Sequence, residues 1–198
     1  MSATRHPTIT VTNIIESIRA EYLRYKALAE AAINQLSDSE ISAQGLNGGN
    51  SIAITCWHIS GNLRSRFTEF LTSDGEKPWR EREEEFRART VTRAELLSKW
   101  EQGWNMLLGT LATLADEQLQ LTVTIRNQPL KVHEALHRSL AHLSYHVGQI
   151  VYIAKSVRGK DWTYLSIPPG KSDVYNQAPT GERAASHQAA LAERTTRK

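Results

Sequence analysis

The sequence predicts an all-α fold, a four-helix bundle with a small β-hairpin before the fourth helix. Two observations carry this prediction. Four long segments repeat apolar residues at three- and four-residue steps, and one short segment alternates apolar with polar residues. The single cysteine excludes an internal disulfide, and 198 residues suffice for one domain with its own core. Because amphipathic helices of about 20 residues must bury their apolar faces, a bundle is the expected arrangement.

The first two helices are separated by a glycine-rich break. The first is expected over about residues 11–36, with apolar positions at Ile14, Ile15, Ile18, Tyr22, Tyr25, Ala29 and Ile33. Three glycines between Gln44 and Asn50 then interrupt the pattern. Asn50 or Ser51 can cap a second helix, expected over about residues 51–72. Its apolar stripe consists of Ile52, Cys56, Ile59, Leu63, Phe67 and Phe70.

A charged segment separates the second and third helices. Residues 73–90 contain proline and many arginines and glutamates, so we expect a long connection there. The sequence TRAE at residues 92–95 matches a capping box and predicts a third helix that reaches about residue 115. Alternation at Leu121, Val123 and Ile125, followed by RNQ and PLKV, predicts the hairpin. The fourth helix is expected over about residues 132–157.

The expected division of the chain is a flexible N-terminus over residues 1–10, the bundle over 11–165 and an irregular extension over 166–198. The last residues of this extension are expected to form a frayed helix or stay disordered. With 40% hydrophobic and 23% charged residues, and with no apolar stretch fit for a signal peptide or a membrane span, a cytoplasmic protein is expected. The formal charge of +3 is mild and basic clusters with interleaved aromatics are missing, so nucleic-acid binding is not expected.

Two histidine pairs in the fourth helix are candidate metal ligands: His133 with His137, and His142 with His146. Histidines four residues apart lie one above the other on a helix and can bind one ion together. At about 100° per residue, His137 and His146 point to opposite sides of the helix. The two pairs therefore cannot share one ion.

Local sequence favours the second pair only modestly. Ala135 and Ser139 lie on its side of the helix and are small enough to leave room for an ion. A third ligand should come from another helix, and His58 is the only other histidine inside a predicted helix, since His6 and His187 lie near the chain ends. The alternative remains open, because histidine pairs at this spacing also occur on ordinary helices and His58 could belong to a solvated edge.

Two sequence blocks resemble the DinB-like superfamily of metal-binding four-helix bundles, and more closely an uncharacterised branch of it. Residues 50–67, followed by WREREEEF at 79–86, match the branch's pattern of a histidine, then Gly-Asn-Leu, then an Arg/Glu-rich connection ending in Phe. Residues 142–150 match the superfamily's His-x-x-x-His-x-Gly-Gln-Ile signature. The resemblance spans about residues 14–176 and includes LSIPPGKSDVYN.

This resemblance implies that His58, His142 and His146 bind a divalent transition metal such as Zn, Ni or Fe. Three imidazoles leave a coordination position open, which is typical of catalytic sites, because structural zinc usually has four protein ligands. Characterised relatives are thiol-using transferases and isomerases. The implied function is an enzyme that activates a low-molecular-weight thiol for transfer, or assists hydrolysis of a small molecule.

Three residues are candidates for binding the small-molecule substrate. Asn62 lies one turn after His58 and Arg66 lies two turns after it, while Gln149 follows His146 by less than one turn. Gln149 can hydrogen-bond within the site or pack in the core. Gly148 is expected to remove a side chain beside the site.

The arginines in and before the charged connection could bind an anionic thiol cofactor or an acidic substrate, because guanidinium binds carboxylates through two hydrogen bonds; they are Arg64, Arg66, Arg80, Arg82 and Arg87. Because glutamates are interleaved with them, a solvated charge run that pairs with itself is the preferred expectation. These glutamates are Glu76, Glu81, Glu83, Glu84 and Glu85.

The rival function is a non-catalytic metal-binding or stress-response module that dimerises through its bundle faces. A third reading is a degenerate relative that keeps the fold and binds little metal. The expected partners are a small-molecule substrate and a second copy in a homodimer, with no membrane. An exposed cleft above the three imidazoles, lined by Arg66 or other polar groups, would favour the enzyme over the module.

Overall fold

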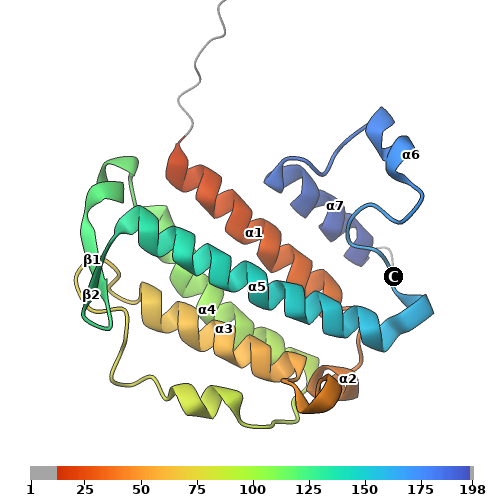
Figure 1. Ribbon diagram of the computed structural model, residues 1–198, viewed down its shortest axis with the longest axis horizontal. Helices are drawn as coiled ribbons and strands as arrows, with labels where there is room; N and C mark the ends of the chain where they lie inside the picture. Colours follow the sequence, from red (N-terminus) through yellow and green to blue (C-terminus); the bar gives the residue numbers. More distant parts are fainter. Residues whose placement is uncertain (1–12, 197–198) are drawn as a thin grey trace, which may run out of the picture.

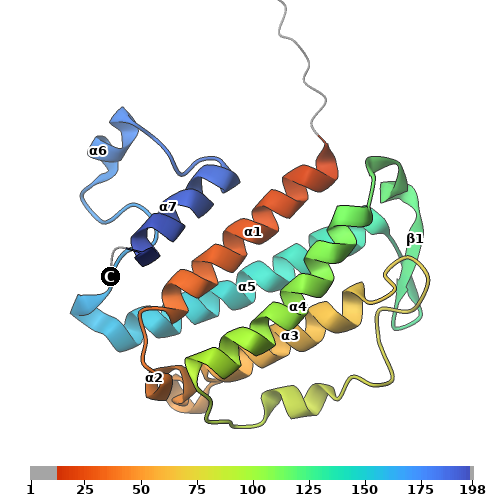
Figure 2. The same cartoon turned by 180° about the vertical axis from the view of Figure 1, so that it is seen from behind.

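The computed structural model describes residues 13–196 and is mostly helical, as predicted. Four long helices run side by side along the molecule (Figure 1): α1 (Ile14–Ile33), α3 (Ile52–Phe67), α4 (Arg93–Thr113) and α5 (Val132–Arg158). Figure 2 shows the same helices from behind, with α4 nearest the viewer. This arrangement places α3 and α5, which carry the candidate histidines, next to each other.

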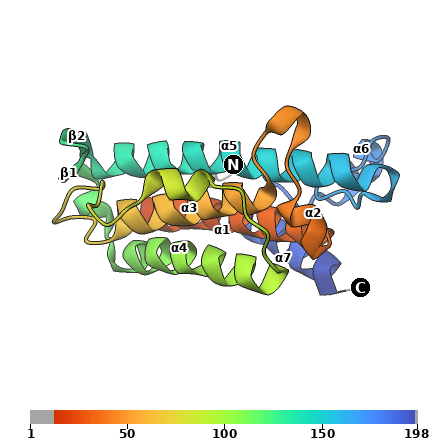
Figure 3. The ribbon, with the colours of Figure 1, turned by 90° about the horizontal axis from the view of Figure 1, so that it is seen from below.

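The four helices enclose one core. Helix α3 packs against α4 and α1 packs against α5, while α3 also contacts α5 and α1 contacts α4 (Figure 3). Trp100, Trp104 and Tyr22 are fully buried between them. A Cβ atom on Gly103 would lie 2.7 Å from Cα of Ser60, so the glycine is what allows α4 to approach α3 this closely.

Helix boundaries follow their capping residues. Ser51 caps α3 by accepting a hydrogen bond from the backbone of Ile54, and Thr92 forms the predicted capping box at the start of α4. The predicted end of the second helix at residue 72 is wrong. Helix α3 ends at Phe67, because Thr68 is extended and Glu69 adopts a left-handed conformation with φ of 49°.

The connection between α3 and α4, residues 68–92, forms a strap that lies along α3 (Figure 3). It contains the 3-10 helix η2 (Arg82–Phe86), which packs on α3. The glycine-rich break before α3 holds the short helix α2 (Asp38–Ser42) and the 3-10 turn η1 (Leu46–Gly48). The strap is therefore a structured part of the fold and brings charged side chains close to α3.

The predicted hairpin is present between the 3-10 helix η3 (Asp116–Gln120) and α5. Strands β1 (Thr122–Ile125) and β2 (Gln128–Lys131) pair antiparallel around a two-residue turn, Arg126 and Asn127, both with φ near 57°. This turn docks on the strap, where the carboxylate of Asp74 accepts hydrogen bonds from the backbone of both turn residues, each at 2.8 Å. The strap and the hairpin thus hold each other in place.

The C-terminal part is more ordered than expected. After the 3-10 turn η4 (Gly159–Asp161) come α6 (Ser172–Gln177) and α7 (Ala184–Thr196). Helix α7 packs against α1 and buries Leu191, so of the two alternatives for the last residues the helix is present, and the extension is not irregular throughout. The predicted flexible N-terminus, residues 1–10, lies outside the described residues. Within the described part, no helix is both long and apolar enough to cross a membrane.

Candidate metal centre

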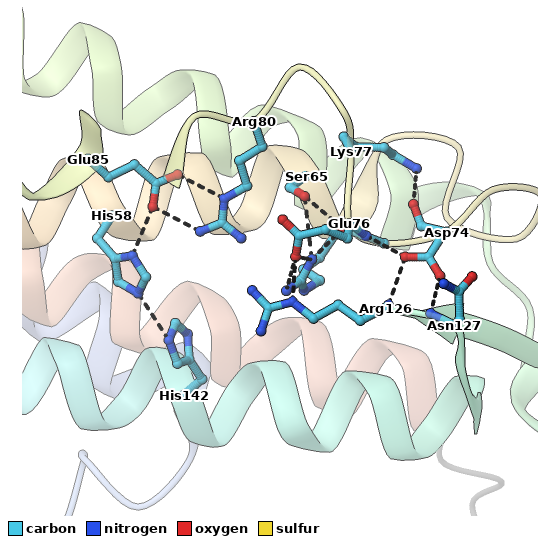
Figure 4. A network of polar contacts seen from close by, with 12 residues as sticks. His58, Ser65, Asp74, Glu76, Lys77, Arg80, Glu85, Arg126, Asn127 and His142 are labelled. Atoms are coloured by element: carbon cyan, nitrogen blue, oxygen red, sulfur yellow. Dashed lines mark hydrogen bonds and ion pairs between the residues drawn. The ribbon is translucent and has the colours of Figure 1, made fainter. Parts of the chain in front are cut away.

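Three imidazoles from two helices converge on one point. His58 lies on α3, His142 and His146 lie one turn apart on α5, and their ligand nitrogens all fall within 4.8 Å of one another. The Nε2 atom of His142 is 3.2 Å from Nε2 of both His58 and His146 (Figure 4 shows the His58 contact). Two nitrogens bound to one tetrahedral zinc ion, at ~2.05 Å each, lie about 3.3 Å apart, so the spacing fits a shared ion.

The hydrogen bonds of the outer nitrogens direct the lone pairs inward. The carboxylate of Glu85 accepts a hydrogen bond from Nδ1 of His58 at 2.9 Å, so Nδ1 carries the proton and Nε2 presents a lone pair to the centre. The side-chain oxygen of Gln149 accepts in the same way from Nδ1 of His146, also at 2.9 Å. A single N–H on His142 cannot satisfy both lone pairs well, whereas a cation would satisfy all three imidazoles.

Glu85 is the main residue that sequence reasoning misjudged. It was expected in a solvated charge run, but the strap places it in the interior with 7% of its surface exposed. Besides His58, it binds the guanidinium of Arg80 through two hydrogen bonds of 2.8 and 2.9 Å (Figure 4). A Cβ atom on Gly61 would lie 2.6 Å from Cδ of Glu85, so this glycine of α3 opens the space that the carboxylate fills.

Burial favours the neutral, metal-binding form of His142 and His146 by lowering the pKa of both side chains. Desolvation, reinforced by the neighbouring His146 and His58, lowers the pKa of His142 to about 4. Desolvation also lowers the pKa of His146, against the opposing effect of the hydrogen bond that His146 donates to Gln149. Burial alone would raise the pKa of Glu85, but the hydrogen bond to His58 and the ion pair with Arg80 outweigh it, so the pKa is lowered and the carboxylate stays charged.

A cavity of about 240 Å³ opens beside the trio and reaches His58 and His142. Asn62 and Arg66, two of the candidate substrate-binding residues, line it. Arg66 is not free, because its guanidinium binds Glu76 at 3.1 Å and also donates to the backbone oxygen of Gly75. The third candidate, Gln149, does not line this cavity and instead contacts His146.

Gly148 does not have the role that its place in the signature suggested. A Cβ atom at this position would meet no atom within 4 Å, so the glycine leaves no space that the site needs. Its side of α5 faces outward, and the expectation that it removes a side chain beside the site is wrong.

The remaining histidines do not join the trio. His133 donates from Nδ1 to the backbone oxygen of Leu119 at 3.0 Å, and its ring lies 6.1 Å from that of His137. His187, which was set aside because it lies near the chain end, accepts a hydrogen bond from Arg24 and donates one to the backbone oxygen of Leu165, so it helps to dock α7. His6 lies outside the described residues.

Sequence reasoning assigned Arg80, like Glu85, to a solvated charge run and did not single out Arg126 or Arg138, although it did name Arg66. Arg80 comes from the strap, Arg126 from the tip of the hairpin and Arg138 from α5. Only Arg138 had a local signal, since it precedes His142 by one helical turn and therefore shares its face. The other two reach the cavity through the packing of strap and hairpin, which the linear sequence does not display.

Comparisons with known proteins support the fold. A family model described as "Protein of unknown function (DUF1572)" matches residues 10–171. The chain is also similar to a solved structure described as the conserved protein of locus from Enterococcus faecalis, with 17% identity and a TM-score of 0.56 over 76% of this chain and 100% of that one. At this identity the likeness shows the fold alone. No curated protein matches the sequence.

Proposed function

The chain belongs to the DUF1572 family of proteins of unknown function, and we propose that it binds one divalent transition-metal ion through His58, His142 and His146. We also propose that α1, α3, α4 and α5 form a four-helix bundle of the DinB-like type. One observation carries the metal proposal. Hydrogen bonds at Nδ1 fix the tautomers of His58 and His146, so that each presents an Nε2 lone pair. Both of these Nε2 atoms lie 3.2 Å from Nε2 of the third imidazole, His142. Zn, Ni and Fe all accept such imidazole ligands.

Three protein ligands leave room for one more, so the proposed activity is that of a metal-dependent enzyme. When bound, the metal would lower the pKa of a water molecule or of a small-molecule thiol and so supply a nucleophile near neutral pH. The reaction is transfer of that thiol to a small molecule, or hydrolysis of one. The cavity that meets His58 and His142 supports an enzyme over a non-catalytic module, because a binding module needs no access to the ion.

The chain's own residues have separate roles in this proposal. Glu85 orients His58 and fixes its tautomer, as carboxylates behind metal-bound histidines do. Gln149 does the same for His146. Asn62 and Arg66 are positioned along the cavity wall to contact the substrate. The homodimer and the cytoplasmic location stay predictions.

Metal analysis of the purified protein tests the proposal. We expect about one metal ion per chain in the wild type and its loss in His146→Ala, because two imidazoles bind a divalent ion weakly. His137→Ala is the matched control, since it removes a histidine of the same helix outside the trio, and it should keep the metal. Equal metal content in all three proteins would refute the site. A screen for thiol conjugation with the metal-loaded protein then tests the activity.

A further inference from the structure

We infer that the cavity beside the histidines binds the oxyanion of a small ligand, a carboxylate or a phosphate group. Its wall carries five guanidinium groups and no carboxylate; the arginines are Arg66, Arg80, Arg82, Arg126 and Arg138. Arginine is suited to this role because its planar fork binds carboxylate and phosphate through paired hydrogen bonds. The anion site is inferred independently of the proposed function. Only the contact between the other end of the ligand and the metal rests on that proposed function.

The carboxylates nearby are too few to neutralise these arginines. Glu76 is shared, because the same oxygen accepts from Arg66 at 3.1 Å and from Arg126 at 2.8 Å. Glu85 is also shared, between Arg80 and His58. Glu83 binds Arg82 at 2.9 Å and is the third carboxylate paired with the five arginines. Three carboxylates thus pair with five guanidinium groups, and the cavity keeps an excess of positive charge.

Arg138 is the clearest donor for an incoming anion. It lies one turn before His142 on α5, is exposed, and forms no ion pair with any of the residues that the structure describes. Since side chains of a helix lean toward its N-terminus, the His142 ring and the Arg138 side chain follow one another along the same wall. An anion held by Arg138 would thus lie next to the histidine cluster.

Arg126 reaches the same cavity from the hairpin. It sits in the turn of the hairpin, which the backbone contacts to Asp74 hold against the strap. In Figure 4 its guanidinium points from the hairpin along α5 toward His142. The docked turn therefore brings a positive charge to the cavity from a different element than Arg138, and an oxyanion in this cavity can bind both arginines.

The size and the remaining lining limit the ligand. The cavity volume of about 240 Å³ lies below the ~300–1,000 Å³ typical of sites for drug-sized ligands, which indicates a small molecule. Phe67, Phe70 and Ile125 supply an apolar part of the wall. The ligand that fits is a small anion with a short apolar portion, and its far end can reach His58 and His142.

Calorimetric titration tests the anion site with two probes, inorganic phosphate and succinate, on chelator-treated and metal-loaded protein. We expect binding in the low-millimolar range or tighter, with or without metal. Arg138→Gln and Arg126→Gln should each weaken it about tenfold, the cost of losing one charge-assisted contact. Lys160→Gln is the matched control, because it removes one exposed charge in η4, just beyond the end of α5. That end of α5 lies about 30 Å along the helix from Arg138 at 1.5 Å per residue.

The outcomes separate this inference from the metal proposal. Arginine-dependent binding of either anion supports the inference, even if metal analysis finds no ion, and the preferred probe identifies the oxyanion. If neither anion binds, or if Lys160→Gln weakens binding as much as Arg138→Gln does, the inference is overturned. Circular dichroism of each variant establishes that a loss of binding does not come from unfolding.

Discussion

The two histidine pairs of α5 have the same spacing and different surroundings. His133 and His137 lie near the hairpin, where Nδ1 of His133 donates to the backbone oxygen of Leu119. Among residues 13–196, no third ligand joins this pair. His142 and His146 lie further along the helix, where His58 from α3 completes a trio. Spacing on one helix therefore supplies two ligands at most. Whether a site forms depends on what the neighbouring helix places opposite.

The two histidine pairs also differ in the residues and the cavity that surround their imidazole rings. The trio has a buried carboxylate, Glu85, that sets the tautomer of His58, and a cavity that gives access to the centre. The pair at His133 lies at the edge of the fold, and His137 is exposed. The arrangement of the trio thus depends on the strap as well as on the helices, because the strap supplies the carboxylate that contacts His58.

Removing His58 should leave His142 and His146 as a pair without a third ligand, like His133 and His137. In His58→Ala we expect metal affinity to fall by more than the ~10–100-fold that loss of an outer partner costs, because a direct ligand is gone. His133→Ala should leave affinity unchanged. Competition with a chromophoric chelator measures both. If His58→Ala bound metal as the wild type does, the trio would not differ from the pair in the way we describe.

Neutralising the carboxylate should have the next largest effect. In Glu85→Gln the charge that supports His58 is lost while the side-chain shape is kept, and we expect metal affinity to fall about 10–100-fold. The buried Arg80 also loses its partner, so the free energy of unfolding should decrease. Glu83→Gln, an exposed glutamate of the same strap, is the control for both measurements and should change neither.

Alanine substitutions at two glycines compare a crowded backbone position beside the trio, Gly61, with an open one, Gly148. Gly61→Ala should displace the carboxylate of Glu85 and weaken metal binding about tenfold, the lower end of the range for outer partners. Gly148→Ala meets no neighbour, so it should leave metal binding unchanged and stabilise the fold by about 0.5–1 kcal/mol through helix propensity. Chelator competition and urea unfolding measure the two effects. Equal metal affinity in both variants would contradict the role given to Gly61.

The smallest expected effect is on the acid dependence of stability at the hairpin end of α5, where metal content should not change. Backbone hydrogen bonds from Glu76 and Asn127 lower the pKa of Asp74 from 3.8 to about 2. A lowered pKa in the folded state means that this contribution to stability is present above pH 3.8 and is lost as the pH falls toward 2. Urea unfolding between these pH values should show a shallower acid dependence in Asp74→Asn, and the metal content at neutral pH should not change.

Much of the fold could be predicted because local chemistry determines it. Ser51 and Thr92 begin helices since their side chains satisfy free backbone groups, and alternation around Val123 indicates the hairpin. The end of α3 was missed because no residue after Phe67 signals a stop, and the left-handed Glu69 reflects how the strap leaves the helix. The packing of α7 on α1 was missed because a short amphipathic end gives no sign of its partner.

The sequence by itself determined which residues share a helix face, and so it brought His142 together with His146 and, one turn earlier, with Arg138. Only the tertiary structure decided that His58 meets them, that Glu85 lies buried behind it and that Arg126 points toward the cavity. The physical reason is the separation along the chain over which each kind of contact acts. A helical turn fixes neighbours four residues apart, whereas the strap and the hairpin take their places only when distant segments pack against the same core.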